Sequence, residues 1–172
     1  MSEQKPTPVV WITGLSGVGK TTVAQHVVAE MNPFQHTVSL DGDILREIFG
    51  GVQAYDADSR RERAFAYSRL CRELATQRTA IVIATISLFH DIHRWNRENI
   101  PGYFEVWLRA PLDELRRRDS KGLYANDHQM AGVHVPVENP EHPDLVIDHF
   151  GDTSPESAAA LILTGLHERG LL

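Results

Sequence analysis

The sequence predicts an α/β domain built around a mostly parallel, five-stranded sheet. Its 172 residues suit one domain with a hydrophobic core of its own. Five short apolar runs alternate with longer, more polar stretches that favour helices. Such alternation is typical of parallel strands joined by crossover helices, which cover both faces of the sheet.

The five expected strands are rich in β-branched residues and almost continuously apolar, as in strands that are buried on both faces. In chain order they read VVWIT (9–13), HTVSL (36–40), AIVIATI (80–86), YFEVWL (103–108) and DLVI (144–147). The expected helices lie at about 19–31, 43–49, 57–77, 91–98, 111–119 and 154–168. Asp58 or Ser59 is the expected N-cap of the third helix. Ser154 followed by Pro155 is a typical start for the last one.

Residues 120–143 are expected to form a lid. This stretch is polar, rich in Gly, Pro, His and Asn, and long for a connection without structure of its own. Long loops of this kind often close over a site. Without repeats or low-complexity segments, residues 1–172 are taken as one domain.

Composition narrows the possible partners. A formal net charge of −6 disfavours a nucleic acid polymer, while local clusters of arginine favour small anionic ligands. No apolar run approaches the roughly 18 residues of a membrane span, and the first residues show no signal pattern. With Cys71 as the one cysteine, no intramolecular disulfide can form. We therefore expect a cytoplasmic protein with no membrane partner. The sequence does not decide the oligomeric state, and a homodimer is one option.

The stretch GLSGVGKT, at residues 14–21, has the spacing of a phosphate-binding loop, Gly-x-x-x-x-Gly-Lys-Thr. It follows an expected strand and opens an expected helix, which is the context that the motif requires. Its glycines let backbone N–H groups turn towards phosphate oxygens, and the helix start adds a positive dipole end. Lys20 can reach the β- and γ-phosphates of a nucleoside triphosphate, and the Thr21 hydroxyl can hold Mg²⁺.

This loop predicts the ligand but not the reaction. The chain contains no Asn-Lys-x-Asp tetrapeptide for reading guanine, which disfavours a GTPase switch. A larger ATPase usually needs a longer chain. A small kinase that passes the γ-phosphoryl group to a metabolite remains.

A second motif, SLDGDILR at residues 39–46, ends the second expected strand. Ligands of open α/β sheets bind beyond the carboxyl ends of strands, so these charges are expected to face the site. A carboxylate here, Asp41 or Asp43, can orient or accept the proton of an acceptor hydroxyl, and Arg46 can hold an acceptor anion. The alternative interpretation of Asp41 and Asp43 is helix capping or plain turn chemistry.

Four motifs follow one another in the chain: GLSGVGKTT, LDGDILR, RDSKGLY (118–124) and NPEHPDLVID (139–148). Together they resemble the adenylyl-sulfate kinase family over nearly the whole chain, from about Val9 to Asp148. The resemblance implies a P-loop kinase fold, with a five-stranded parallel sheet, helices on both faces and a short lid. It also implies the transfer of phosphate from MgATP to the ribose 3′-hydroxyl of adenylyl sulfate, which gives PAPS.

The resemblance further implies roles for single residues. Lys20 and Asp43 are the expected catalytic residues, with Asp43 as the base, and Thr21 and Asp41 are expected at the magnesium ion. The residues expected to bind ATP are Gly14, Ser16, Gly17, Gly19, Lys20, Thr21, Thr22 and Arg118. The residues expected at the acceptor are Asp41, Arg46, Tyr55, Arg60, Arg63, Ser87, Lys121 and Met130.

This chain departs from the family pattern on the acceptor side. Arg63 stands for an asparagine, Leu88 for a proline and Met130 for a stacking phenylalanine. Ile92-His93 stands for Asp-Arg. The stretch TISLFHDIHRWNRENIPGYFEV also resembles a branch associated with surface polysaccharides, which includes a cytidine diphosphoramidate kinase. The donor is therefore expected to be ATP, while the acceptor stays open.

Three hypotheses remain after this comparison of motifs. The first is an adenylyl-sulfate kinase, and the second is a kinase for another nucleotide conjugate such as cytidine diphosphoramidate. The third is a non-catalytic nucleotide-binding module, which needs no base, so that the presence of both Lys20 and Asp43 argues against it. His90 and His93 lack further ligands at zinc spacing and are expected at the surface or in the acceptor pocket.

Overall fold

A computed structural model describes residues 5–49, 56–119, 124 and 131–172. Its strands are β1 (Val9–Thr13), β2 (Thr37–Asp41), β3 (Ala80–Ala84), β4 (Tyr103–Arg109) and β5 (Leu145–Asp148). They form one sheet in the order β2-β3-β1-β4-β5, and every neighbouring pair is parallel. The prediction of an α/β fold with a five-stranded parallel sheet is confirmed.

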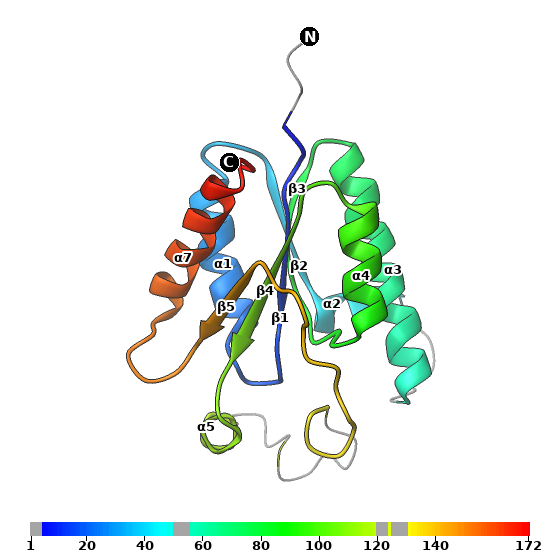
Figure 1. Ribbon diagram of the computed structural model, residues 1–172, viewed down its shortest axis with the longest axis vertical. Coiled ribbons are helices and arrows are strands. Elements are labelled where there is room, and N and C mark those ends of the chain that lie inside the picture. Colours follow the sequence, from blue (N-terminus) through cyan, green and yellow to red (C-terminus); the bar gives the residue numbers. More distant parts are fainter. Residues whose placement is uncertain (1–4, 50–55, 120–123, 125–130) are drawn as a thin grey trace.

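The described helices are α1 (Lys20–Met31), α2 (Gly42–Phe49), α3 (Ala57–Thr76), α4 (His90–Asn99), α5 (Leu112–Arg117) and α7 (Pro155–Glu168). Helices α1 and α7 pack together on one face of the sheet, and α3 and α4 pack on the other (Figure 1). The sheet is therefore the middle layer of three, and its strands end together at one edge, where the connections can form a site.

Two hydrophobic cores lie on the two faces of the sheet. Val10 and Ile12 belong to the core beneath α1 and α7. Val9 and Trp11 belong to the core beneath α3 and α4. Successive side chains of a strand point to opposite faces, so β1 contributes to both cores, and its run of apolar residues has no polar interruption.

The strand predicted at 80–86 is two residues shorter in the structure, because β3 ends at Ala84. At this level Ala84 still pairs with Ile12 of β1 and with Asp41, the last residue of β2. The chain enters α2 directly after Asp41, so β3 loses this neighbour and the apolar run continues as a loop. That loop becomes one wall of the site described below.

The prediction for the cap of α3 is wrong. The helix begins at Ala57, so the cap position falls on Asp56 rather than on Asp58 or Ser59. The Asp56 carboxylate accepts a hydrogen bond from the backbone N–H of Ser59 at 2.9 Å, as an N-cap side chain should. Ser154 caps α7 as predicted, with a proline in the first turn.

Cys71 lies buried in α3. Burial raises the pKa of its thiol to about 12, so the group stays protonated and unreactive at neutral pH. In the described part of the chain, none of the helices is long and apolar enough to cross a membrane.

Candidate active site

The carboxyl ends of β1, β2 and β3 open onto a cavity of about 740 Å³. Its walls are the loop from β1 to α1, the start of α2 and the loop after β3. Side chains of α3 and residues of the predicted lid complete it. The amino end of β1 and the C-terminus lie at the opposite edge of the sheet (Figure 1). The cavity, at the carboxyl ends of the strands, therefore lies where open α/β sheets bind their ligands.

The phosphate-binding loop between β1 and α1 has the backbone that its glycines predict. Gly14, Gly17 and Gly19 have positive φ angles of 150°, 77° and 97°. A Cβ atom at Gly14 would overlap the carbonyl oxygen of Leu108 on β4, so a side chain does not fit there. Helix α1 starts directly after Gly19, which has no side chain to cap it. A helix start of this kind favours a bound anion.

Lys20 is half-buried at the start of α1, and its Nζ donates a hydrogen bond to the carbonyl oxygen of Leu15 at 2.8 Å. Loss of solvation lowers the pKa of Lys20 to about 8, although the charges of Asp43 and Asp41 oppose this shift. Phosphate oxygens beside the ammonium group would offset the lost solvation. The lysine is thus prepared for an anionic ligand.

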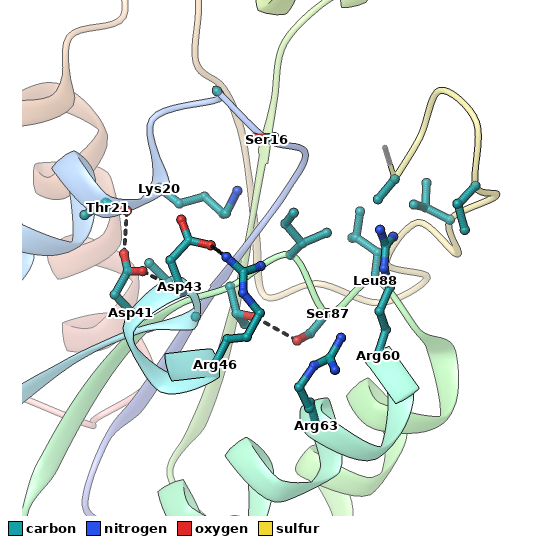
Figure 2. Close-up of a pocket in the computed structure, with 18 of the residues that line it drawn as sticks. Ser16, Lys20, Thr21, Asp41, Asp43, Arg46, Arg60, Arg63, Ser87 and Leu88 are labelled. Carbon is teal, nitrogen blue, oxygen red and sulfur yellow. Dashed lines mark hydrogen bonds and ion pairs between the residues drawn. The ribbon is translucent and has the colours of Figure 1, made fainter. Parts of the chain in front are cut away.

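Thr21 and Asp41 meet beside the loop (Figure 2). Thr21 Oγ1 donates to Asp41 Oδ2 at 2.7 Å, and Asp41 Oδ1 accepts from the backbone N–H of Asp43 at 2.8 Å. Mg²⁺ prefers oxygen ligands, and at phosphate sites it needs one or two protein groups besides phosphates and waters. This pair therefore fits a magnesium ion. Within the described ranges, no group of three or more His, Cys, Asp or Glu residues is arranged to hold a metal.

Asp43 and Arg46 lie three residues apart on α2, so both project from the same side of the helix. Arg46 Nη2 donates to Asp43 Oδ1 at 3.0 Å, and both side chains are exposed at the cavity wall. Exposed pairs of this kind are worth at most about 1 kcal/mol, so an incoming anion can replace Asp43 as the partner of Arg46. The alternative interpretation, helix capping, requires a carboxylate that accepts a backbone N–H at the start of α2. Asp41 makes this contact, with the N–H of Asp43.

Helix α3 brings two more arginines to the same cavity. Arg60 and Arg63 point from α3 into the space that Arg46 also reaches (Figure 2). Tyr67, one helical turn after Arg63, lines the cavity as well, and burial raises the pKa of its hydroxyl. Sequence reasoning missed Tyr67, although its spacing from the two arginines on one helical face was an available signal.

Ser87 lies in the loop after β3, as the sequence placed it. Its hydroxyl is 2.8 Å from the hydroxyl of Thr85, and both residues are buried at the cavity wall. Thr85 was not predicted, because the apolar run that contains it was taken as strand up to residue 86. Ser87 lies near the arginines of α2 and α3 (Figure 2), and Thr85 lines the same cavity.

The rim beside the phosphate-binding loop is held by contacts between distant parts of the chain. Arg118 lines the cavity and donates to the carbonyl oxygen of His149 at 3.0 Å. The ring of His149 in turn lies 2.7 Å from the carbonyl oxygen of Val18. Tyr124, in the predicted lid, donates its hydroxyl to the carbonyl oxygen of Ser16 at 2.7 Å. No sequence signal pointed to the contact of His149 with Val18 or to that of Tyr124 with Ser16, because each joins residues that are more than 100 positions apart.

Most of the predicted site residues therefore meet in one place. The cavity is lined by Ser16, Gly17, Gly19, Lys20, Thr21, Thr22, Asp41, Asp43, Arg46, Arg60, Arg63, Ser87 and Arg118. Tyr55, Lys121 and Met130 lie outside the described residues.

The expectation for His93 is wrong. It is neither at the surface nor part of the cavity wall, because it is buried behind the loop after β3. His90 is half-buried, and its Nε2 lies 2.8 Å from the carbonyl oxygen of Asn139.

Comparison with known proteins relates this arrangement to one family. The family profile of adenylylsulphate kinase matches residues 6–148. A cytidine diphosphoramidate kinase of Campylobacter jejuni is 34% identical over 164 residues, which cover 92% of this chain and 95% of that protein. An adenylyl-sulfate kinase of Halothermothrix orenii is 35% identical over 170 residues, covering 95% and 91%.

A solved structure shows the same relation. The Mycobacterium tuberculosis APS kinase, in complex with AMPPNP and APS, has a TM-score of 0.85 and 28% identity, covering 95% of this chain and 99% of that one. Profile, relatives and structure agree over nearly the whole length of the chain. This protein belongs to the adenylylsulphate kinase family.

Proposed function

We propose that this kinase transfers the γ-phosphoryl group of MgATP to a ribose hydroxyl of a nucleotide that carries a small activated anion, most simply adenylyl sulfate. One observation carries the proposal: a single cavity joins the phosphate-binding loop, the carboxylates that follow β2, and the arginines of α2 and α3. The loop accounts for the donor. The arginines on the opposite wall supply a second anion site, which a simple nucleotide-binding module does not need.

On the donor side, each group has one task. Lys20 and the N–H groups of the loop hold the β- and γ-phosphates, and Thr21 and Asp41 hold Mg²⁺. When bound, the ion neutralises charge that develops on the transferred group. Arg118 lines the cavity at the rim of the loop, and we assign it to covering ATP. Catalysis then consists mainly of positioning and electrostatic stabilisation.

On the acceptor side, Asp43 is the candidate base. As the acceptor oxygen bonds to the γ-phosphorus, the bond to the ADP oxygen breaks and the hydroxyl proton moves to the Asp43 carboxylate. Asp41 is less suited to this task, since both of its oxygens already accept hydrogen bonds. Asp43 is exposed to the cavity, and its partner Arg46 can turn to the acceptor anion.

Cytidine diphosphoramidate is the second candidate acceptor. The Campylobacter jejuni relative is named for it and aligns over nearly the whole chain. Adenylyl sulfate and cytidine diphosphoramidate both carry two adjacent oxyanion groups on a ribose, so the same arginines suit either. Arg63, where the family pattern has an asparagine, adds a positive charge on this wall.

The test is kcat/KM for the two conjugates with MgATP, followed by ADP release and by the mass of the product. We expect phosphorylation of at least one of them. A preference for adenylyl sulfate of about 10⁴ or more, which is over 5 kcal/mol of discrimination, would assign the first candidate. ATP turnover that responds to neither conjugate would overturn the proposed function.

Arg63→Asn is expected to raise the KM for the acceptor by about tenfold, because a charge-assisted hydrogen bond to an oxyanion is replaced by a neutral one. The KM for ATP should change little, since Arg63 lies on the acceptor wall. Arg69→Asn, on the exposed side of the same helix, is the matched control and should leave both constants unchanged. An equal rise in both KM values would contradict the assignment of Arg63 to the acceptor.

The affinity for MgATP should fall as the pH rises through about 8. Lys20 has its pKa lowered to about 8 in the free protein, and phosphates bind its protonated form. Above that pH most of the free protein has a neutral Lys20, which must take up a proton when MgATP binds. The dissociation constant for MgATP should therefore rise by up to about tenfold per pH unit. Calorimetry with the non-hydrolysable analogue AMPPNP between pH 7 and pH 9.5 measures this.

Lys20→Arg is the control for this pH dependence. Its guanidinium group stays protonated throughout the range, so its affinity should be flat between those two pH values. A wild-type affinity that is equally flat would show that another group, not Lys20, meets the phosphates.

A further inference from the structure

The acceptor wall contains a residue in an unfavourable backbone conformation. Ser87 has a φ angle of 25°, and Arg78 is the other non-glycine residue with positive φ in the described ranges. Left-handed backbone is unfavourable for a residue with a Cβ atom, so surrounding contacts must hold it. Such residues occur where the position of a group matters for function.

A buried histidine supplies one of these contacts. His93 Nε2 lies 3.0 Å from the carbonyl oxygen of Ser87, which also accepts the backbone N–H of Phe89 at 3.1 Å. A carbonyl oxygen only accepts, so the Nε2 atom carries its hydrogen and donates it. The hydroxyl of Ser87, beside that of Thr85, belongs to the cavity wall. His93 thus holds the backbone of a residue whose side chain faces the acceptor.

The other ring nitrogen of His93 is anchored in the interior. Its Nδ1 lies 3.1 Å from Oε1 of Glu105, a residue of β4 whose side chain is 2% exposed. Both atoms are buried and have no hydrogen-bond partner elsewhere in the described ranges, so each is available to the other. Glu105 is itself held in place, since its Oε2 accepts from Arg97 at 3.1 Å and Arg97 also binds Asp144.

A single proton satisfies this contact between ring and carboxyl. With the hydrogen on Nε2, a neutral ring presents a lone pair at Nδ1. Burial disfavours the charged form of both groups, since it lowers the pKa of His93 to about 4 and raises the pKa of Glu105. Contacts therefore run from Glu105 in the interior, through the ring of His93, to Ser87 at the cavity wall.

We propose that His93 is a positioning residue for the phosphoryl acceptor. Anchored on Glu105, it holds the carbonyl group of Ser87 and thereby keeps the hydroxyls of Ser87 and Thr85 at the wall where the acceptor binds. His93 does not line the cavity itself, so it acts through Ser87. This role rests on the proposed function, because it requires an acceptor on the Ser87 side of the cavity.

Two amide variants separate this role from a general effect on the fold. In His93→Gln, the amide nitrogen can take the place of Nε2 and still donate to the carbonyl oxygen of Ser87. In His93→Asn, the shorter amide takes the place of Nδ1 and meets only Glu105. We expect His93→Asn to raise the acceptor KM by roughly ten- to a hundredfold while the ATP KM and kcat change little. His93→Gln should recover most of that loss.

Hydrogen exchange provides a readout that needs no acceptor. The backbone N–H of Phe89 donates to the carbonyl oxygen of Ser87, and that of Glu138 donates to the carbonyl oxygen of Leu88. Both amides should exchange faster in His93→Asn and at the wild-type rate in His93→Gln. Thermal melting of the two variants shows whether each is folded.

The proposal is overturned if the two folded variants have the same acceptor KM and the same exchange rates. It is also overturned if the KM for ATP rises as much as the KM for the acceptor. If the wild-type enzyme phosphorylates neither conjugate, the proposed function fails, while the exchange rates still decide whether His93 holds Ser87.

Discussion

Replacing Lys20 with alanine is expected to lower kcat/KM for phosphoryl transfer by about 100-fold or more, because removing one preorganised charged group from such a site typically costs that much. The hydrogen bond to the Leu15 carbonyl holds the ammonium group at the loop before ATP arrives. The fold should survive the change. Burial already disfavours the ammonium form of Lys20, as its lowered pKa of about 8 shows, and alanine removes that cost.

Lys5→Ala is the matched control for this variant. It also removes one lysine, but the Lys5 ammonium group is exposed and donates to the carbonyl oxygen of Leu172, at the edge of the sheet opposite the cavity (Figure 1). Initial rates over a range of ATP and acceptor concentrations measure both variants. If Lys20→Ala keeps more than about a tenth of the wild-type rate, the phosphate-binding loop has been assigned the wrong role.

Replacing Asp43 with asparagine is expected to leave MgATP binding nearly unchanged and to lower kcat by about 10²- to 10⁴-fold. The substitution keeps the size of the side chain and removes the proton acceptor. Asparagine can still accept a hydrogen bond from Arg46, so the start of α2 should keep its structure. Calorimetry with AMPPNP and a coupled kinase assay on the same preparation separate binding from transfer.

Two further aspartates serve as comparisons. Asp113 forms an exposed pair with Arg116 at the same three-residue spacing, on α5, so Asp113→Asn should leave the rate unchanged. Asp41→Asn should instead weaken the binding of MgATP, because Asp41 shares the proposed magnesium site with Thr21. If Asp43→Asn turns over at the normal rate, Asp43 is not the base. If Asp41→Asn also turns over at the normal rate, the mechanism needs no carboxylate base at this position.

The features that could be predicted from the sequence are those that depend on residues close together in the chain. The strands and helices follow from the alternation of apolar runs with polar stretches, since the period of the pattern selects the element. The phosphate-binding loop follows from glycines whose backbone freedom is a property of the residue itself, as the positive φ angles of Gly14, Gly17 and Gly19 show. Asp41 and Asp43 follow from their place after a strand.

The ends of elements depend on neighbours rather than on local pattern. The expected run 80–86 extends beyond Ala84, but Ala84 pairs with Asp41, where β2 ends, so β3 loses that neighbour and stops. Likewise, the cap of α3 falls on Asp56 because the helix begins at Ala57, although aspartate and serine residues follow within three positions. Several nearby residues are of types that cap helices, so the local pattern does not distinguish among them.

The sequence by itself determined the fold class, the phosphate-binding loop and the family, because each depends on residues that act within one short segment. Only the tertiary structure decided that Thr85 joins the cavity wall and that Tyr124 contacts the loop. It also decided that His93 lies between Ser87 and Glu105. These contacts join residues from different elements and connecting loops. Their geometry arises when the helices pack on the sheet, and no spacing along the chain encodes it.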